Sequence, residues 1–179
     1  MLEITIPAYE LYNDVTQEFI EERARTIHLE HSLISISKWE SRWNKPFLAT
    51  REMTNEQVMD YIKCMTIDKG VPETAYLYID NNQYTKINDY MSAPMTATTI
   101  TDTNSGMSRE IITSELLYYY MITCNIPLEC EKWHINRLLT LIKVCSVKNG
   151  DQKKKPQAEV MRDNAALNAA RKKKFNTRG

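Results

Sequence analysis

Four side chains have the residue types and spacings of a metal site. Cys130 and His134 are four residues apart, which would place both on one face of a helix, and His28 and His31 are three apart. Thiolates and imidazoles are preferred ligands of Zn²⁺, so these four would form a zinc site if the N-terminal segment packed on the C-terminal helices. A histidine satisfied by a backbone carbonyl is the commoner fate of such side chains, and we expect no resident metal or other cofactor.

The pair of Cys130 and His134 also raises the question of covalent catalysis. A nucleophilic cysteine needs an electropositive surrounding, but Cys130 lies between Glu129 and Glu131, whose carboxylates oppose thiolate formation. The chain contains none of the sequences GxGxxG, GxxxxGKS/T, HExxH or GxSxG, which mark nucleotide, zinc-protease and serine-hydrolase sites. We therefore expect a protein that is not an enzyme.

Aromatic residues are concentrated in two places. Residues 118–120 are three consecutive tyrosines, and Trp39 and Trp43 lie four residues apart. Aromatic rings can stack on nucleic-acid bases, but such surfaces are normally interleaved with basic residues. The tyrosines have Leu, Met and Ile as neighbours instead, so we expect them to pack in the core.

Charge divides the chain into an acidic body and a basic tail. The 179 residues have no net charge, yet residues 151–179 carry a net charge of +6, which leaves −6 on the remainder. A basic tail can be a flexible solubilising segment, can bind nucleic acid, or can dock on an acidic surface of a partner or a neighbouring copy. Its basic residues are Lys153, Lys154, Lys155, Arg162, Arg171, Lys172, Lys173, Lys174 and Arg178.

The sequence favours a soluble intracellular protein. No segment resembles a signal peptide, and no apolar run approaches the ~18 residues that span a bilayer. The four cysteines include no CxxC pair and lie in apolar surroundings, which is typical of reduced, buried thiols.

Alternating apolar residues predict strands near the N-terminus. Residues 2–6, 17–22 and 25–30 have the period of half-buried strands, so we expect a small antiparallel sheet or hairpin packed on helices. A helix is predicted at 33–44, with Ser32 as its N-cap and Pro46 beyond its end.

Further helices follow in the central part of the chain. Thr54 and Gln57 match a capping box, and the helix that they open has one apolar face ending at Met65. A shorter helix is predicted at about 81–91, and residues 92–107 form the longest predicted loop.

The strongest helical pattern lies between residues 108 and 147. Ser108 is the predicted cap of a helix that carries Ile111, Ile112, Leu116, Tyr119 and Ile122 on its buried face. Asn125-Ile126-Pro127 ends that helix, and a second one carries Ile135, Leu138, Leu139, Ile142 and Cys145. The short connection predicts an antiparallel helix hairpin.

These patterns predict an α+β fold that is mainly α. Residues 1–31 form a small antiparallel β element, residues 32–148 form a helical body that ends in the helix hairpin, and residues 149–179 form the basic, Ala/Lys-rich tail.

Nearly the whole chain resembles one family of small siphophage proteins, the tail assembly chaperones. The motifs that carry the resemblance are LEHSLISISKWESRWNKPF, DYIKCMTI, INDYMSAPMTATT, REIITSELLYYYMITCNIPLECEKWHINRLLTLIKVC and NAALNAARKKKFNTRG. The resemblance implies a non-enzymatic factor of the host cytoplasm that binds the tape-measure protein and assists assembly of the tail tube. It also implies short and frameshift-extended forms that are absent from the finished virion.

Two other functions remain open at the level of sequence. The protein could be a virion structural subunit of the neck, tail or capsid, whose basic arm ties neighbouring subunits together. It could also be an accessory protein that binds nucleic acid through the same arm. A homo-oligomer is possible whichever function holds. In each case we expect partner binding by the nine basic residues of the tail and by Trp39 and Trp43, unless the tryptophans clamp the junction of sheet and helices.

Overall fold

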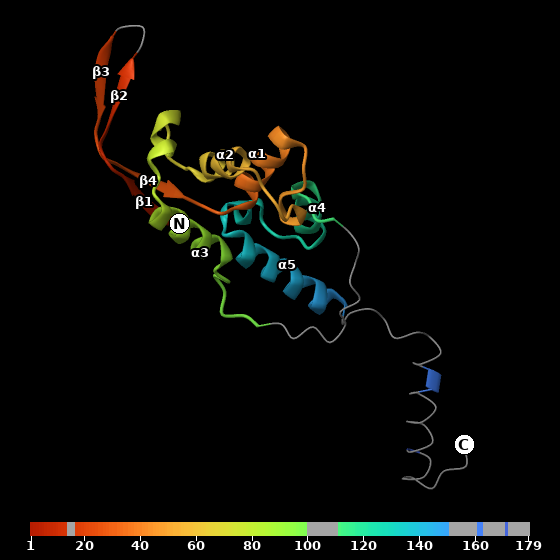
Figure 1. Cartoon of the computed structure of the whole chain (residues 1–179). Helices are drawn as coiled ribbons and strands as arrows, with labels where there is room; N and C mark the ends of the chain where they lie inside the picture. Colours follow the sequence, from red (N-terminus) through yellow and green to blue (C-terminus); the bar gives the residue numbers. More distant parts are fainter. Residues whose placement is uncertain (14–16, 100–110, 151–160, 163–170, 172–179) are drawn as a thin grey trace. The chain divides into compact units, whose positions relative to one another are not determined.

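The computed structural model describes residues 1–13, 17–99, 111–150, 161, 162 and 171 (Figure 1). The chain divides into two units, Met1–Val144 and Cys145–Gly179. The fold is α+β and mainly α, as the sequence predicts. None of the described helices combines the length and the apolar character that crossing a lipid bilayer requires.

Two antiparallel pairs of strands open the chain. β1 (Leu2–Ile6) pairs with β4 (Arg25–Leu29), and β2 (Tyr9–Asn13) pairs with β3 (Glu18–Glu22). The pair of β2 and β3 extends beyond the first pair as a separate ribbon (Figure 1). The predicted strands are confirmed as β1, β3 and β4. The sequence does not predict β2, because the apolar residues at consecutive positions 11 and 12 blur the alternation.

The pair of β1 and β4 contributes one side of the core. Ile4, Ile6, Ile27 and Leu29 are buried, and they alternate with polar residues that remain at the surface. The outer edge of β4 is covered by the chain after the second helix, because the Ile67 amide donates to the His28 carbonyl oxygen at 2.9 Å.

The helix predicted at 33–44 is confirmed as α1 (Leu33–Trp43). Its N-terminus is closed reciprocally: the Ser32 hydroxyl accepts from the Ser35 amide, and the Ser35 hydroxyl accepts from the Ser32 amide. The helix ends where Asn44 adopts a left-handed conformation with φ of 50°, which asparagine tolerates better than most residues.

Capping boxes also begin α2 (Asn55–Met65) and α3 (Asn81–Ser92). Thr54 and Gln57 exchange side-chain-to-backbone hydrogen bonds at the start of α2, which confirms the predicted motif. Asp80 caps α3 in the same way. The 3₁₀ helix η2 (Glu73–Tyr78) lies between these helices, and residues 93–99 of the predicted loop belong to no helix or strand.

The helix α4 (Ser114–Thr123) begins later in the chain than its apolar pattern predicts. Ser108, the predicted cap, lies outside the described residues, whereas Ile111 and Ile112 are exposed and precede the helix. The cap is Thr113, whose hydroxyl accepts from the Leu116 amide.

This later start changes which face of α4 is buried. Leu117 and Met121 are buried, whereas Tyr119 and Ile122 of the predicted face are exposed. The prediction was wrong here because it counted the two isoleucines at 111 and 112 as part of the helical period.

The last helix contains all five apolar residues that the sequence assigns to it. α5 (Ile135–Gly150) buries Ile135 and Leu138, and the Asn136 side-chain amide fastens its first turn by donating to the carbonyl oxygens of Met91 and Ala93 at 3.1 and 2.8 Å. The 3₁₀ helix η3 (Leu128–Lys132) separates α4 from α5. The main helix that α4 contacts is α1, not α5 as the predicted hairpin requires.

Most of the predicted basic tail lies outside the described residues. Arg162 and Arg171 are described, and both are helical and exposed. The other basic candidates for partner binding that fall outside the described part are Lys153, Lys154, Lys155, Lys172, Lys173, Lys174 and Arg178.

A single buried carboxylate joins three elements of the body. Glu40 of α1 is 8% exposed, and its Oε1 accepts from the Phe47 amide at 2.8 Å, at the start of the 3₁₀ helix η1 (Phe47–Ala49). Its Oε2 accepts from the Ser114 amide at 2.7 Å, in the first turn of α4. A carboxylate is tolerated in a protein interior when such donors replace water, and these donors belong to segments that are far apart in sequence.

Replacement of Glu40 by glutamine tests this junction. Gln has only one acceptor oxygen, so one of the two amides would face a side-chain NH₂ group and remain unsatisfied. We expect E40Q to lower the free energy of unfolding by about 2 kcal/mol and the melting temperature by about 4–8 °C, measured by circular dichroism. The control is E52Q at an exposed position, which should melt within about 1 °C of the parent chain. Equal melting temperatures for all three proteins would contradict the role of Glu40.

Candidate functional site

The two candidate tryptophans serve the contact between α1 and α2. Trp39 is completely buried, and its indole nitrogen donates to the Gln57 carbonyl oxygen at 3.0 Å. Trp43 is half-buried and donates to Asp60 Oδ2 at 2.9 Å, while the Asp60 carboxylate also pairs with Arg42. Trp39 therefore offers no surface to a partner in this fold, and its indole holds the two helices together.

Two of the candidate metal ligands meet in the core. The rings of His31 and His134 lie 5.1 Å apart between centroids, one at the end of β4 and the other before α5. The Ile135 amide donates to the His31 carbonyl oxygen at 2.7 Å, so the backbone joins the same two segments. The two histidines are thus part of the connection between the N-terminal strands and the last helix.

Each histidine ring has its own hydrogen-bond partner. His31 Nδ1 lies 2.5 Å from the hydroxyl of Tyr61. His134 Nε2 lies 3.0 Å from the Tyr90 carbonyl oxygen, and because a carbonyl only accepts, Nε2 carries the proton. His134 Nδ1 is then free to accept from the Asn136 amide at 3.3 Å. This is the arrangement of a neutral, structurally satisfied imidazole.

Burial keeps both imidazoles uncharged. Burial, reinforced by the neighbouring His134, lowers the pKa of His31 to about 3. Burial also lowers the pKa of His134, although its hydrogen bond to the Tyr90 carbonyl opposes that shift. Burial raises the pKa of Tyr61, which therefore stays protonated. No proton-transfer couple near neutral pH arises from these residues.

The other two candidate ligands lie elsewhere. His28 faces the surface between Asp68 and Glu3, with its Nδ1 3.2 Å from the Asp68 carboxylate. Cys130 is buried in η3. Across the ranges that the structure describes, no group of three or more His, Cys, Asp or Glu side chains is close enough to hold a metal ion.

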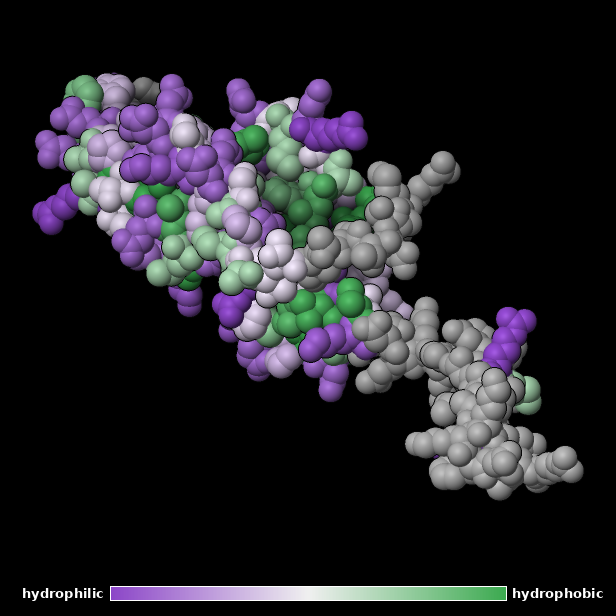
Figure 2. Space-filling view, turned by 90° about the horizontal axis from the view of Figure 1, so that it is seen from below, coloured by the Kyte–Doolittle hydropathy of each residue, from purple (hydrophilic) through white to green (hydrophobic). Residues whose placement is uncertain are grey.

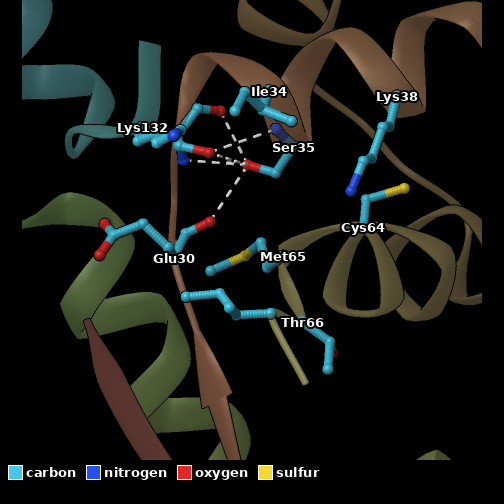
Figure 3. A pocket seen from close by; sticks show the side chains of 10 residues that line it. Glu30, Ile34, Ser35, Lys38, Cys64, Met65, Thr66 and Lys132 are labelled. Atoms are coloured by element: carbon cyan, nitrogen blue, oxygen red, sulfur yellow. Dashed lines mark hydrogen bonds between the residues drawn. The ribbon is translucent and has the colours of Figure 1, made fainter. Parts of the chain in front are cut away.

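A pocket of about 300 Å³ lies between α1 and the end of α2 (Figure 3). The Ser35 hydroxyl in its wall donates to the carbonyl oxygens of Glu30 and Ser32 at 3.2 and 2.7 Å, so it is engaged by the backbone. Burial raises the pKa of the Cys64 thiol, which disfavours the thiolate, although the Lys38 side chain points toward it (Figure 3). The Glu30 carboxylate points away from the pocket and binds the Tyr90 hydroxyl. The pocket thus presents no activated nucleophile among its described lining residues.

The most unusual exposed feature is an apolar surface on α4. We call the exposed side chains of Tyr119 and Ile122 the α4 surface; Ile111 and Ile112, which precede the helix, and Leu128, which follows it, are also exposed. Tyr119 and Ile122 are 58% and 70% exposed and lie three residues apart, on one side of the helix. Glu115 is the only charged residue of α4. A helix that is apolar on nearly all sides is typical of one that is covered on nearly all sides.

Apolar side chains reach the surface elsewhere too, as patches among polar groups (Figure 2). Leu77 in η2 is also 70% exposed, and the ribbon of β2 and β3 exposes Tyr12, Phe19 and Ile20. Single exposed apolar residues need no explanation, but several close together on one element indicate a binding surface. The α4 surface and the ribbon are therefore the candidate sites of this chain.

Sequence reasoning missed the residues that complete the polar core. Glu40, Tyr61 and Tyr90 become important through partners that are distant in sequence, and no local pattern marks them. One available signal was the composition of α4, which has a single charge in ten residues. That composition predicts burial, but it does not distinguish burial in the core from burial against a partner.

The neutral histidines predict a loss of stability in mild acid. The unfolded chain takes up protons below about pH 6.5, whereas burial lowers the pKa of His31 to about 3 and also lowers the pKa of His134. The free energy of unfolding therefore falls as pH decreases below about 6.5. We expect up to about 1.4 kcal/mol per pH unit for each histidine, measured by urea unfolding between pH 8 and pH 5.

The variant H31F should remove the contribution of one histidine to this slope. The matched control H28F replaces a histidine on β4 without touching the buried pair. An unchanged slope in H31F would show that the buried pair does not cause the pH dependence.

Comparisons of the chain with protein-family models, curated proteins and solved structures give no match. Function is therefore inferred from the geometry of the described residues and from the resemblance that the sequence motifs carry.

Proposed function

We propose that this protein is a non-enzymatic phage tail assembly chaperone that binds the tape-measure protein through the α4 surface. The observation that supports the proposal is an apolar helix whose outer side is exposed. The resemblance implies a partner whose long helix must be kept in solution, and an exposed apolar helix face is one means of binding such a partner. The sequence motifs that resemble this family include the whole of α4.

The anchoring of α4 suits a binding surface. Its inner side is fixed by Leu117 and Met121 in the core and by the Glu40 hydrogen bond at its first turn. Tyr119 and Ile122 are thus displayed on a helix whose position is set by buried contacts. A pre-positioned surface loses less conformational entropy on binding than a mobile one.

The side chains that are capable of catalysis make structural contacts instead, and this also favours binding over catalysis. His31 and His134 hold the core together, and Ser35 is bonded to the backbone. Burial disfavours the thiolate of Cys64. The α4 surface, by contrast, is exposed and available to a partner.

The proposal predicts that one charge on α4 abolishes partner binding. The chain and the tape-measure protein of the same phage genome are co-expressed, and the co-purified tape-measure protein is quantified. We expect I122E to reduce it at least about tenfold, because a charge would be buried in an apolar contact. The matched control is L77E, which changes an equally exposed residue on η2 and should leave binding unchanged.

Mass spectrometry of purified virions and of infected-cell lysate provides the independent test. A chaperone should be abundant in the lysate and absent from virions. A stoichiometric amount in virions would overturn the proposal and favour the structural-subunit alternative. Equal binding by I122E, L77E and the parent chain, with circular dichroism showing intact folds, would exclude the α4 surface as the binding site.

A further inference from the structure

The ribbon of β2 and β3 is a protruding element with little internal support. Within the described residues its two strands pair only with each other. The base of the ribbon is fastened by Tyr9, whose ring stacks on Tyr78 with centroids 4.0 Å apart. The Tyr78 hydroxyl also donates to the Glu10 carbonyl oxygen. A two-stranded ribbon is marginally stable in water, so the exposed part beyond this base gains from a partner.

One face of the ribbon combines exposed rings with opposed carboxylates. Tyr12 and Phe19 face each other across the strands with ring centroids 5.1 Å apart, and they are 52% and 69% exposed. Glu10 and Glu21 are the next facing pair on the same face. Like charges directly opposite each other destabilise a strand pair. The ring pair stabilises the ribbon only modestly and stays exposed, and the carboxylate pair opposes strand pairing. Both features suit an occupant that is basic and partly apolar.

The remaining charges of the ribbon have the same sign. Glu18, Glu21 and Glu22 form no ion pair with any described residue. A hollow of about 760 Å³ lies at the base of the ribbon, and the charged residues that line it are Glu10, Glu21, Glu22 and Arg23. The net charge along the ribbon is therefore strongly negative.

This charge restricts what can cover the ribbon. A second ribbon would bring further carboxylates against the first, so pairing of two ribbons is disfavoured. A purely apolar partner would have to desolvate the carboxylates without compensating them. A segment with lysines next to an apolar residue would satisfy both the rings and the charges.

The chain itself contains such a segment. Residues 151–179 carry a net charge of +6, and Lys172, Lys173 and Lys174 directly precede Phe175. These 29 residues could span at most about 100 Å when extended, which is long enough to reach a neighbouring molecule. The charges of this segment and of the first 150 residues are equal and opposite.

We propose that the ribbon of one copy binds the basic C-terminal segment of a second copy, residues 171–178, in a head-to-tail contact. The lysines neutralise the glutamates of the ribbon, and Phe175 packs beside Tyr12 and Phe19. A contact between two different surfaces can close as a reciprocal pair or a larger ring, or can continue as an open chain of subunits. The inference does not depend on the tape-measure proposal, which concerns the α4 surface.

Reciprocal charge reversal on the full-length chain tests the proposal. Protein with and without nuclease treatment is analysed by sedimentation velocity over a range of protein and salt concentrations. We expect concentration-dependent association that weakens with salt, and at least about tenfold weaker association in either E21K/E22K or K172E/K173E. The chain that carries both pairs of substitutions should regain association, because the opposite charges are restored with their positions exchanged.

The matched control for net charge is E52K/D89K, which reverses two exposed acidic residues on the body and should associate like the parent chain. Circular dichroism checks that each variant is folded. A monomeric parent chain, a loss of association in the control equal to that in E21K/E22K, or no recovery in the combined variant would each overturn the proposal. Association that disappears on nuclease treatment would show that nucleic acid, rather than the ribbon, is bound by the tail.

Discussion

The body of this protein depends on one buried carboxylate. The Glu40 carboxylate, on α1, accepts hydrogen bonds from the Phe47 amide and the Ser114 amide. Ser114 lies 74 residues after Glu40 in the chain. A buried charge in this position is stable only while both amides donate to it. A shift of the start of α4 would therefore leave the carboxylate without one of its hydrogen bonds. The carboxylate thereby sets where α4 begins, which side of it faces α1, and which side remains at the surface.

Other polar side chains in the core act in the same way. The indole of Trp39 holds α2, the imidazole of His134 holds the end of α3, and the hydroxyl of Tyr61 meets His31. Each uses a hydrogen bond to fix the relative position of two elements that apolar packing alone would leave less well defined. The histidines that resemble catalytic or metal-binding groups in the sequence, His31 and His134, thus form hydrogen bonds that stabilise the fold.

The two surfaces that remain have different chemistry. The α4 surface is apolar and rigidly supported, which suits a partner helix, whereas the ribbon is acidic and aromatic, which suits a basic segment. Both surfaces leave apolar side chains exposed in the isolated chain. Apolar burial would supply most of the binding free energy at the first, and charge would determine the choice of partner at the second.

The sequence by itself determined the local structure: the strands β1, β3 and β4, the N-cap at Ser32, the capping box at Thr54, and the division into acidic body and basic tail. These depend on neighbours within a few residues, so a local pattern contains them. Only the tertiary structure decided which side of α4 is buried and which histidines meet. Those outcomes depend on contacts of Glu40 with α4 and of His31 with His134, before α5. These partners are far apart in sequence, so no local pattern indicates that they meet.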